Sequence, residues 1–214
     1  MELAITIRPG QYGPGTWAES GKRVVEDPDG ELVARVAKGD ATAARAIMAR
    51  HLPKILNLGR RMLGDQADAE DVAQDVFVKV WTHAGRWQPG QAKFETWLHR
   101  VAINLCYDRL RRKPTSAIDD VPEPVDGAPG PAARLFEAQI AGAVNDALKR
   151  LPDRQREALV LCHYQGLTNI DAAQIMGVSV EAMESLLSRG RRTLKAMLKP
   201  VSEHAFQKNE DEGT

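Results

Sequence analysis

Apolar side chains recur at three- and four-residue steps along most of the chain, a spacing that predicts amphipathic α-helices. The clearest stripe runs through residues 68–81 and consists of Ala69, Val72, Ala73, Val76, Phe77 and Val80. Acidic and amide side chains occupy the opposite face, and Gly64 precedes an acidic first turn that suits the positive end of a helix dipole. The pattern predicts a helix with one buried face. Its acidic face is either a solvated capping surface or a docking surface for a basic partner.

A second helix is predicted over residues 94–113, with an apolar stripe of Phe94, Trp97, Leu98, Val101, Ala102 and Leu105. The residues outside that stripe are largely polar or basic, and they include His99, Arg100, Asn104, Arg111, Arg112 and Lys113. A basic helix that begins with aromatic residues suits a strand of nucleic acid, because Lys and Arg neutralise phosphates and rings stack on bases. The same charges also occur on ordinary solvated helices. In the preceding loop, residues 82–93, Trp87 either packs in the core or is exposed for binding.

Two more helices are predicted before residue 64. The first covers residues 29–37 with a stripe of Leu32, Val33, Val36 and Ala37. The second covers residues 41–63, where Asp40 is expected to cap the start, Pro53 to bend the helix and Gly64 to end it. Its predicted buried stripe is Ala44, Ile47, Met48, Leu52, Ile55, Leu58 and Leu63. These four helices predict a compact domain over residues 29–113.

A second helical domain is predicted over residues 132–199. Its first helix carries Leu135, Phe136, Ile140, Val144, Ala147, Leu148 and Leu151, and Pro152 is expected at the first position of the next helix. That next helix has a stripe of Ala158, Leu159, Leu161 and Cys162, and it ends at Gly166.

The last two helices of this domain are predicted to be unequal in length. Thr168 is expected to cap a short helix over residues 169–176, and the turn Gly177-Val178-Ser179 leads into a longer basic helix over residues 180–198. A short helix, a tight glycine turn and a longer basic helix are typical of a DNA-binding helix-turn-helix unit. A generic helical hairpin with a solvated basic end is the alternative.

Composition agrees with an all-α protein of two small helical domains. Of 214 residues, 43% are hydrophobic, 27% charged and 5% aromatic, and no strand-like alternation persists. The formal net charge is zero, yet the segments around residues 100–113 and 189–199 are basic. The Pro-rich acidic stretch 114–131 predicts a flexible linker, residues 1–28 a disordered N-terminal extension, and residues 200–214 an acidic C-terminal tail.

Catalytic, metal-binding and membrane-spanning roles find no support in the sequence. The histidines are scattered, without carboxylates or cysteines at ligand or triad spacing: His51, His83, His99, His163 and His204. Cys106 and Cys162 are too far apart to form a metal pair and are expected to be small core residues. No apolar run approaches the ~20 residues that cross a bilayer, and no signal pattern opens the chain. We therefore expect no cofactor, metal or small-molecule substrate, no membrane span, and a soluble cytoplasmic protein.

The runs DAEDVAQDVFVKVW and FETWLHRVAINLCYDRLRRK resemble region 2 of bacterial RNA polymerase sigma factors of the extracytoplasmic-function group. LPDRQREALVL, LTNIDAAQIMGVS and the basic helix that follows are similar to sigma region 4. The resemblance covers residues 29–199 and implies a non-catalytic subunit that binds core RNA polymerase and directs promoter recognition, strand opening and transcription initiation. It also implies an anti-sigma factor as a partner and a stress regulon as the target.

The resemblance also implies site residues. Those expected to dock on the large polymerase subunit are Asp71, Gln74, Asp75 and Phe77. Those expected at the downstream promoter element, with the loop 86–93 capturing a flipped base, are Arg86, Trp87, Lys93, Trp97, Arg100, Asn104, Arg111 and Arg112. Those expected at the upstream element are Ser179, Glu181, Ala182, Ser185, Ser188 and Arg189, with Arg191 and Arg192 on phosphates.

This sequence departs from the family at two positions, with Glu184 and Leu186 where basic residues are common. A Glu near DNA repels phosphate unless it accepts a hydrogen bond from cytosine, which predicts unusual or weak readout of the upstream element. One rival hypothesis is a sigma-like mimic that sequesters an anti-sigma factor, but no receiver-domain pattern is present. A free-standing helix-turn-helix regulator is the other rival, and it leaves the acidic helix 68–81 unexplained. The regulon, inducing signal and exact promoter sequence do not follow from the residues.

Overall fold

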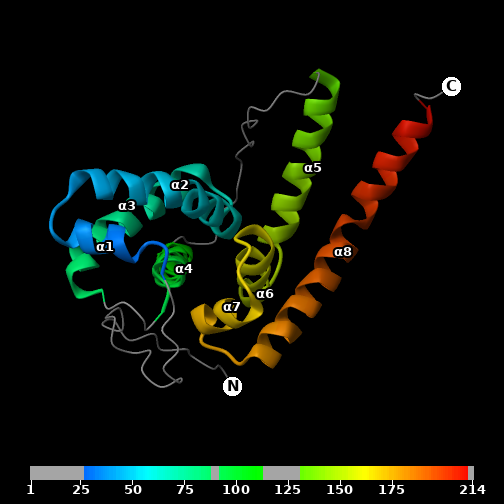
Figure 1. Ribbon diagram of the computed structural model, residues 1–214. Coiled ribbons are helices and arrows are strands. Elements are labelled where there is room, and N and C mark those ends of the chain that lie inside the picture. Colours follow the sequence, from blue (N-terminus) through cyan, green and yellow to red (C-terminus); the bar gives the residue numbers. More distant parts are fainter. Residues whose placement is uncertain (1–26, 88–91, 113–130, 212–214) are drawn as a thin grey trace.

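The computed structural model in Figure 1 describes residues 27–87, 92–112 and 131–211, with side chains for all of these except 131–139 and 200–211. Every regular element in this part of the chain is helical, which confirms the all-α prediction. The predictions for residues 1–26, the loop tip 88–91 and most of the linker, residues 113–130, lie outside the described residues.

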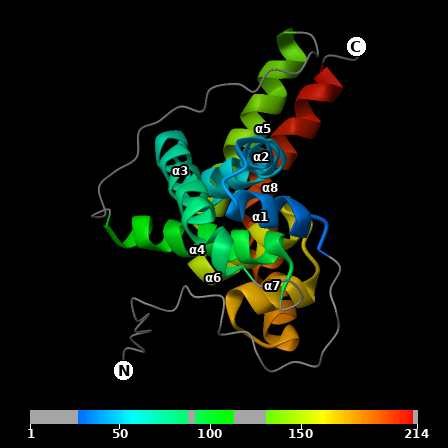
Figure 2. The ribbon, with the colours of Figure 1, turned by 60° about the vertical axis from the view of Figure 1, so that its left-hand side comes forward.

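The first half consists of α1 (Gly30–Ala37), α2 (Ala41–Leu63), α3 (Gln66–His83), the 3-10 turn η1 (Ala84–Arg86) and α4 (Phe94–Arg112). Helix α2 packs against α1, α3 and α4, and Figure 2 shows it nearly along its axis. Asp40 caps α2 as predicted, because its carboxylate accepts the backbone N–H groups of Thr42 at 2.8 Å and Ala43 at 3.2 Å. Gly64 ends α2 in the left-handed region, with φ of 71°.

The predicted stripe of α3 is entirely buried, whereas that of α2 was misplaced by part of a turn. The buried face of α2 consists of Ala43, Ile47, His51, Ile55, Leu58, Gly59 and Met62. Met48 is 36% exposed instead. The α2 face is set by α3, which approaches so closely at Gly59 that an added Cβ would lie 3.0 Å from the Cα of Ala69. The contact admits only glycine without a shift of α3.

The second half consists of α5 (Pro131–Lys149), α6 (Asp153–Leu159), the π-helical turn η2 (Val160–Tyr164), α7 (Asn169–Met176) and α8 (Val180–Asp211). Thr168 caps α7 as predicted, since its hydroxyl oxygen accepts the N–H of Asp171 at 3.1 Å. Pro152 is the N-cap of α6 and not its first helical residue. Ile140 is 38% exposed, so it does not belong to the buried stripe of α5.

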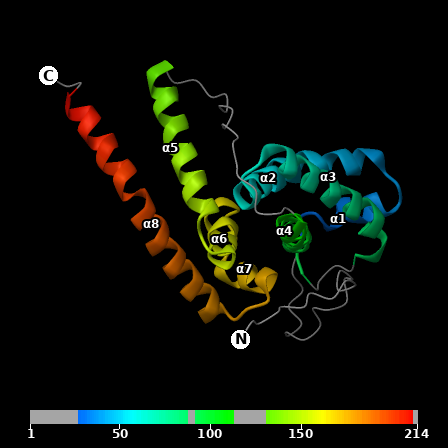
Figure 3. The same ribbon diagram turned by 180° about the vertical axis from the view of Figure 1, so that it is seen from behind.

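Helix α8 is much longer than predicted. It continues through Pro200 to Asp211, so the backbone of most of the predicted tail is helical. The strong helix formers Glu, Ala, Gln and Lys are common after Pro200, and their propensity favours continuation. Figures 1 and 3 show α5 and α8 projecting in the same general direction, away from α7.

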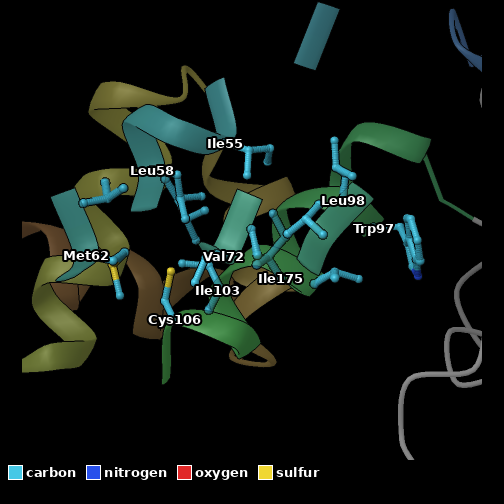
Figure 4. Close-up of a cluster of buried hydrophobic side chains, with 14 of the residues drawn as sticks. Ile55, Leu58, Met62, Val72, Trp97, Leu98, Ile103, Cys106 and Ile175 are labelled. Atoms are coloured by element: carbon cyan, nitrogen blue, oxygen red, sulfur yellow. The ribbon is translucent and has the colours of Figure 1, made fainter. Parts of the chain in front are cut away.

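The two halves pack against each other around one continuous core. Helix α2 contacts α5 and η2, and α4 contacts α7. In Figure 4, Ile175 of α7 lies among core side chains of the first half that include Ile103 of α4 and Val72 of α3. The packing therefore buries a face of α4 that would otherwise be open to solvent.

Polar contacts also cross between the halves. The Tyr107 hydroxyl donates to the Glu157 carboxylate at 2.7 Å, and the Arg156 guanidinium donates to the Met62 carbonyl at 2.9 Å. The Arg61 guanidinium lies 4.3 Å from the centroid of the Tyr164 ring. Since buried polar groups are costly without partners, these contacts help define one arrangement of the two halves.

Candidate nucleic-acid and partner interfaces

The outer face of α3 presents a mixed acidic and apolar stripe. Asp71, Gln74 and Asp75 are exposed, and Val78, at the next position on the same face, is 51% exposed. Phe77, predicted to dock on a partner, is only 3% exposed and packs in the core. Val78 supplies the apolar side chain on this face instead. The sequence analysis missed it, although an apolar residue outside the buried stripe is a signal for an exposed contact. We name Asp71, Gln74, Asp75 and Val78 the α3 outer stripe.

Arg109 of α4 connects this stripe to the neighbouring helix. Its guanidinium pairs with Asp68, with Nε 3.1 Å from Oδ1, and with Asp71. Arg109 thus fixes α4 against the acidic side of α3, and one carboxylate of the outer stripe already has an intramolecular cation beside it.

An aromatic cluster lies where the loop 88–91 leaves and rejoins the fold. The ring of Phe94 has its centroid 5.7 Å from that of Trp87 and 5.6 Å from that of Trp97. Trp97 is 7% exposed and packs in the core of this arrangement, so the contact with DNA that the resemblance implies for it stays a prediction. Trp87 is half-buried and packs against the core, which leaves part of its side chain open to solvent, so its binding role stays a prediction. Its buried indole N–H has no hydrogen-bond partner among the described residues.

Basic residues lie on both sides of the loop and at the far end of α4. Arg86 and Lys93 are exposed at the two sides of the loop. Further along α4, Arg111 pairs with Asp108 and Arg112 is exposed. The start of the loop and the end of α4 thus present cations to solvent, as phosphate binding requires.

The middle of α4 is less open, because α7 packs beside it. Arg100 and Asn104 are half-buried, and burial lowers the pKa of the Arg100 guanidinium. His99, which the sequence placed on the polar face, is fully buried, and its Nδ1 donates to the Glu95 carbonyl at 2.8 Å. Its Nε2 faces the carboxamide of Gln165, 3.3 Å away in the second half. Burial lowers the pKa of His99 and favours the neutral ring.

Helices α7 and α8 form the predicted helix-turn-helix. Gly177 joins them in the left-handed region with φ of 64°, and Met183 and Leu187 anchor α8 in the core. The opposite face of the first turns of α8 is solvent-exposed at every predicted upstream-element residue: Ser179, Glu181, Ala182, Ser185, Ser188 and Arg189. An exposed N-terminal face on a braced second helix is the geometry with which such units enter a major groove.

Two residues of that face also serve the helix itself. Ser179 caps α8, since its hydroxyl oxygen accepts the N–H of Ala182 at 3.2 Å. The pKa of Glu181 is lowered by hydrogen bonding to its own backbone N–H and to Ser179. A carboxylate at this end of a helix is also favoured by the dipole. Arg191 and Arg192 are exposed one turn further on, where they can reach phosphates.

The two positions that depart from the family have different surroundings. Glu184 is exposed on α8, so its charge faces any DNA bound there. Leu186 is half-buried and packs against the core, which explains why an apolar residue is tolerated at that position. The predicted unusual or weak readout of the upstream element therefore depends on Glu184 and not on Leu186.

Neither a metal site nor a membrane span was found where the chain is described. No group of three or more His, Cys, Asp or Glu side chains could hold an ion within the described ranges. None of the helices searched there combines the length and apolar character needed to cross a bilayer.

Comparison with known proteins identifies the family of the chain. Residues 47–114 match the family described as Sigma-70 region 2, and residues 141–194 match Sigma-70 region 4. The ECF RNA polymerase sigma factor SigE of Mycolicibacterium smegmatis is 30% identical over 92% of this chain and 77% of its own length. SigM of Mycobacterium tuberculosis is 35% identical over 81% of this chain and 86% of its own.

Solved structures agree with these sequence relatives. The structure of CnrH in complex with the cytosolic domain of CnrY resembles this fold with a TM-score of 0.63 at 30% identity, covering 81% of this chain and 99% of that one. CnrH is an RNA polymerase sigma factor of Cupriavidus metallidurans. With both conserved regions matched in order and full-length relatives at this identity, the chain belongs to the extracytoplasmic-function group of the sigma-70 family of RNA polymerase sigma factors.

Proposed function

We propose that this sigma factor reads an upstream promoter element with the exposed N-terminal face of α8 and a downstream element with the loop 86–93 and the polar side of α4. The observation that carries the proposal is that the six predicted base-facing residues, Ser179 and five in α8, are exposed while Met183 and Leu187 hold the helix from behind. Sigma factors act in the cytoplasm together with core RNA polymerase, and we place this protein there.

Run-off transcription with purified core polymerase on a promoter library tests this assignment. A defined pair of elements should be enriched among transcribed templates, and Ser185→Ala should alter the preferred upstream bases while leaving the downstream ones unchanged. Ala196→Ser, also exposed on α8 but beyond the proposed face, is the matched control. Enrichment that is unaffected by Ser185→Ala and changed by Ala196→Ser would contradict the assignment.

We place polymerase docking on the α3 outer stripe. Its acidic and amide groups suit a basic partner surface, and exposed Val78 supplies an apolar contact at its end. Phe77 supports the stripe from inside the core and does not itself meet the partner. Co-purification of core polymerase with the double variant Gln74→Ala, Asp75→Ala tests the stripe, with retained helicity as the control for folding.

We also propose that the packed arrangement of the two halves is a resting form that must open on promoter binding. Arg100 and Asn104, both assigned to the downstream element, are half-buried on α4, a helix that packs against α7. A nucleic-acid strand running along α4 needs these side chains free, and two separate DNA elements need two separable modules. Residues 113–130, which join the modules, allow such a separation by their length and proline-rich composition.

An inhibitory protein partner fits this scheme. CnrH, a 30% identical relative, was solved in complex with the cytosolic domain of CnrY. We propose an inhibitory anti-sigma partner for this chain, with a stress signal releasing it. The chain purified from its host should carry a stoichiometric protein that blocks run-off transcription at equimolar amounts. Isolation with polymerase alone, in stressed and unstressed cells, would contradict this control.

The same transcription assay separates the two rival functions. A mimic that only sequesters an anti-sigma factor would give no promoter-dependent transcript with core polymerase. A free-standing helix-turn-helix regulator would bind the upstream element without polymerase and would tolerate substitutions in the α3 outer stripe.

A further inference from the structure

Residues 27–29 lie against the start of α4, far from their own position in the sequence. One carboxylate oxygen of Asp27 accepts the backbone N–H of Phe94 at 2.6 Å, and the other accepts the N–H of Asp29 at 2.9 Å. Asp27 therefore joins the segment that precedes α1 to the first residue of α4. We name residues 27–29 the N-terminal clasp.

The N-cap position of α4 is occupied by a residue that cannot accept a hydrogen bond through its side chain. The residue before Phe94 is Lys93, whose ammonium group has no acceptor for the free N–H groups at a helix start. Asp27 supplies the missing acceptor from elsewhere in the chain, and its negative charge suits the positive end of the helix dipole. The first turn of α4 is thus fixed by a residue outside the matched region 2, which begins at residue 47.

The other end of the clasp is anchored on α2. Asp29 is 3% exposed, its Oδ2 lies 2.8 Å from Nε2 of His51, and its Oδ1 pairs with Arg50. His51 in turn packs edge-on against Phe94, with ring centroids 5.8 Å apart. Two separate sets of contacts therefore connect the clasp to Phe94. Asp27 accepts its backbone N–H, and Asp29 holds His51, whose ring packs against the Phe94 ring.

Phe94 stands at the centre of the aromatic cluster that flanks the loop 88–91. Trp87, on the other side of that loop, meets Phe94 at right angles, with centroids 5.7 Å apart. Any movement of the first turn of α4 changes the distance between the two ends of the loop. Capture of a flipped base depends on a preformed pocket, because the pocket must recover the cost of unstacking.

We propose that Asp27 is a positioning residue for downstream-element readout: it touches no DNA, but it fixes the start of α4 and with it the position of Phe94 against Trp87, the aromatic residues on the two sides of the proposed base-capturing loop. This inference rests on the proposed function, which assigns the loop to the downstream element. It gives the clasp a role in promoter selectivity beyond that of a structural cap.

The test compares Asp27→Ala with two matched variants. Asp27→Asn keeps an oxygen that can accept the Phe94 N–H. Asp40→Ala removes a cap of the same kind from a different helix, α2. Two quantities are measured on the full chain: amide hydrogen exchange at residues 94–97 without DNA, and base preference at each downstream position in run-off transcription with core polymerase.

For Asp27→Ala, exchange at residues 94–97 should rise about fivefold and preference for the favoured downstream base should fall by a similar factor, as expected for the loss of one cap. Preference at the upstream element should stay unchanged, which separates this effect from general destabilisation. Asp27→Asn should retain most of the wild-type preference, and Asp40→Ala should leave both quantities near wild type.

Faster exchange with unaltered base preference would overturn the proposal, because the cap would then be structural only. An equal loss of downstream preference in Asp40→Ala would also overturn it, since global stability would explain the effect. If the wild-type chain itself shows no downstream preference, the proposed function fails and the inference falls with it. A loss of preference in Asp27→Ala alone leaves the proposed function in place and supports the clasp.

Discussion

Replacing Tyr107 by Phe should make the packed arrangement easier to open. The Tyr107 hydroxyl donates to Glu157 across the two halves at 2.7 Å, and Glu157 is 1% exposed. Arg154 remains as a second partner at 3.0 Å, so the carboxylate is weakened but not orphaned. A hydrogen bond to a charged group contributes about 1.5–3 kcal/mol, and we expect about 2 kcal/mol here.

This loss acts on the balance between packed and open forms. At about 1.4 kcal/mol per factor of ten, 2 kcal/mol shifts the balance toward the open form about 30-fold. If only the open form binds the promoter with core polymerase, apparent affinity should rise by up to the same factor while the free energy of unfolding falls. The opposite directions of the two changes are the signature of an opening step.

Denaturant unfolding and titration of core polymerase on a promoter fragment measure the two quantities. Tyr164→Phe is the matched control, since it is the ring of Tyr164 that contacts Arg61, and both quantities should stay unchanged. In a Glu157→Gln background the effect of Tyr107→Phe should shrink, because the acceptor is no longer charged. Lower stability accompanied by unchanged or weaker binding would refute the proposal that the halves must separate.

Other substitutions probe the remaining surfaces. Val78→Lys on the α3 outer stripe should weaken core polymerase binding at least tenfold, in a pull-down where Met48→Lys, another exposed apolar position, binds normally; equal losses would refute the stripe. Arg191→Ala should weaken binding to all promoter sequences and lower the slope of log affinity against log salt by about one, whereas a change confined to one sequence would remove the phosphate assignment. Burial lowers the pKa of His99 below its ordinary 6.5, so the unfolded chain takes up the proton first and unfolding free energy should fall as pH drops through 6.5. Burial raises the pKa of Glu157, so at lower pH its protonation should raise the unfolding free energy instead of lowering it. The wild type is therefore compared with His99→Gln, in which the dependence of unfolding free energy on pH near 6.5 should be absent. Identical slopes in the two proteins would contradict the assignment.

The sequence predicted well what depends on local pattern. The stripe of α3, the caps Asp40 and Thr168 and the glycine stops at Gly64 and Gly177 are all set by residues within a turn or two of one another. Exposure of the α8 face also follows from the same periodicity, because the buried Met183 and Leu187 define the opposite side.

The errors arose where distant parts of the chain meet. His99 was placed on a polar face, although it is fully buried and faces Gln165 of the second half. The cap that Asp27 provides to Phe94 joins residues far apart in sequence, which no local pattern reveals.

Start-site selection by purified core RNA polymerase tests the central claim most directly. With the full chain added, the polymerase should begin transcription at a fixed distance from one pair of elements in a promoter library, and scrambling either element should reduce the transcript. Polymerase that starts transcription no differently with and without the chain, across every template in the library, would contradict the account.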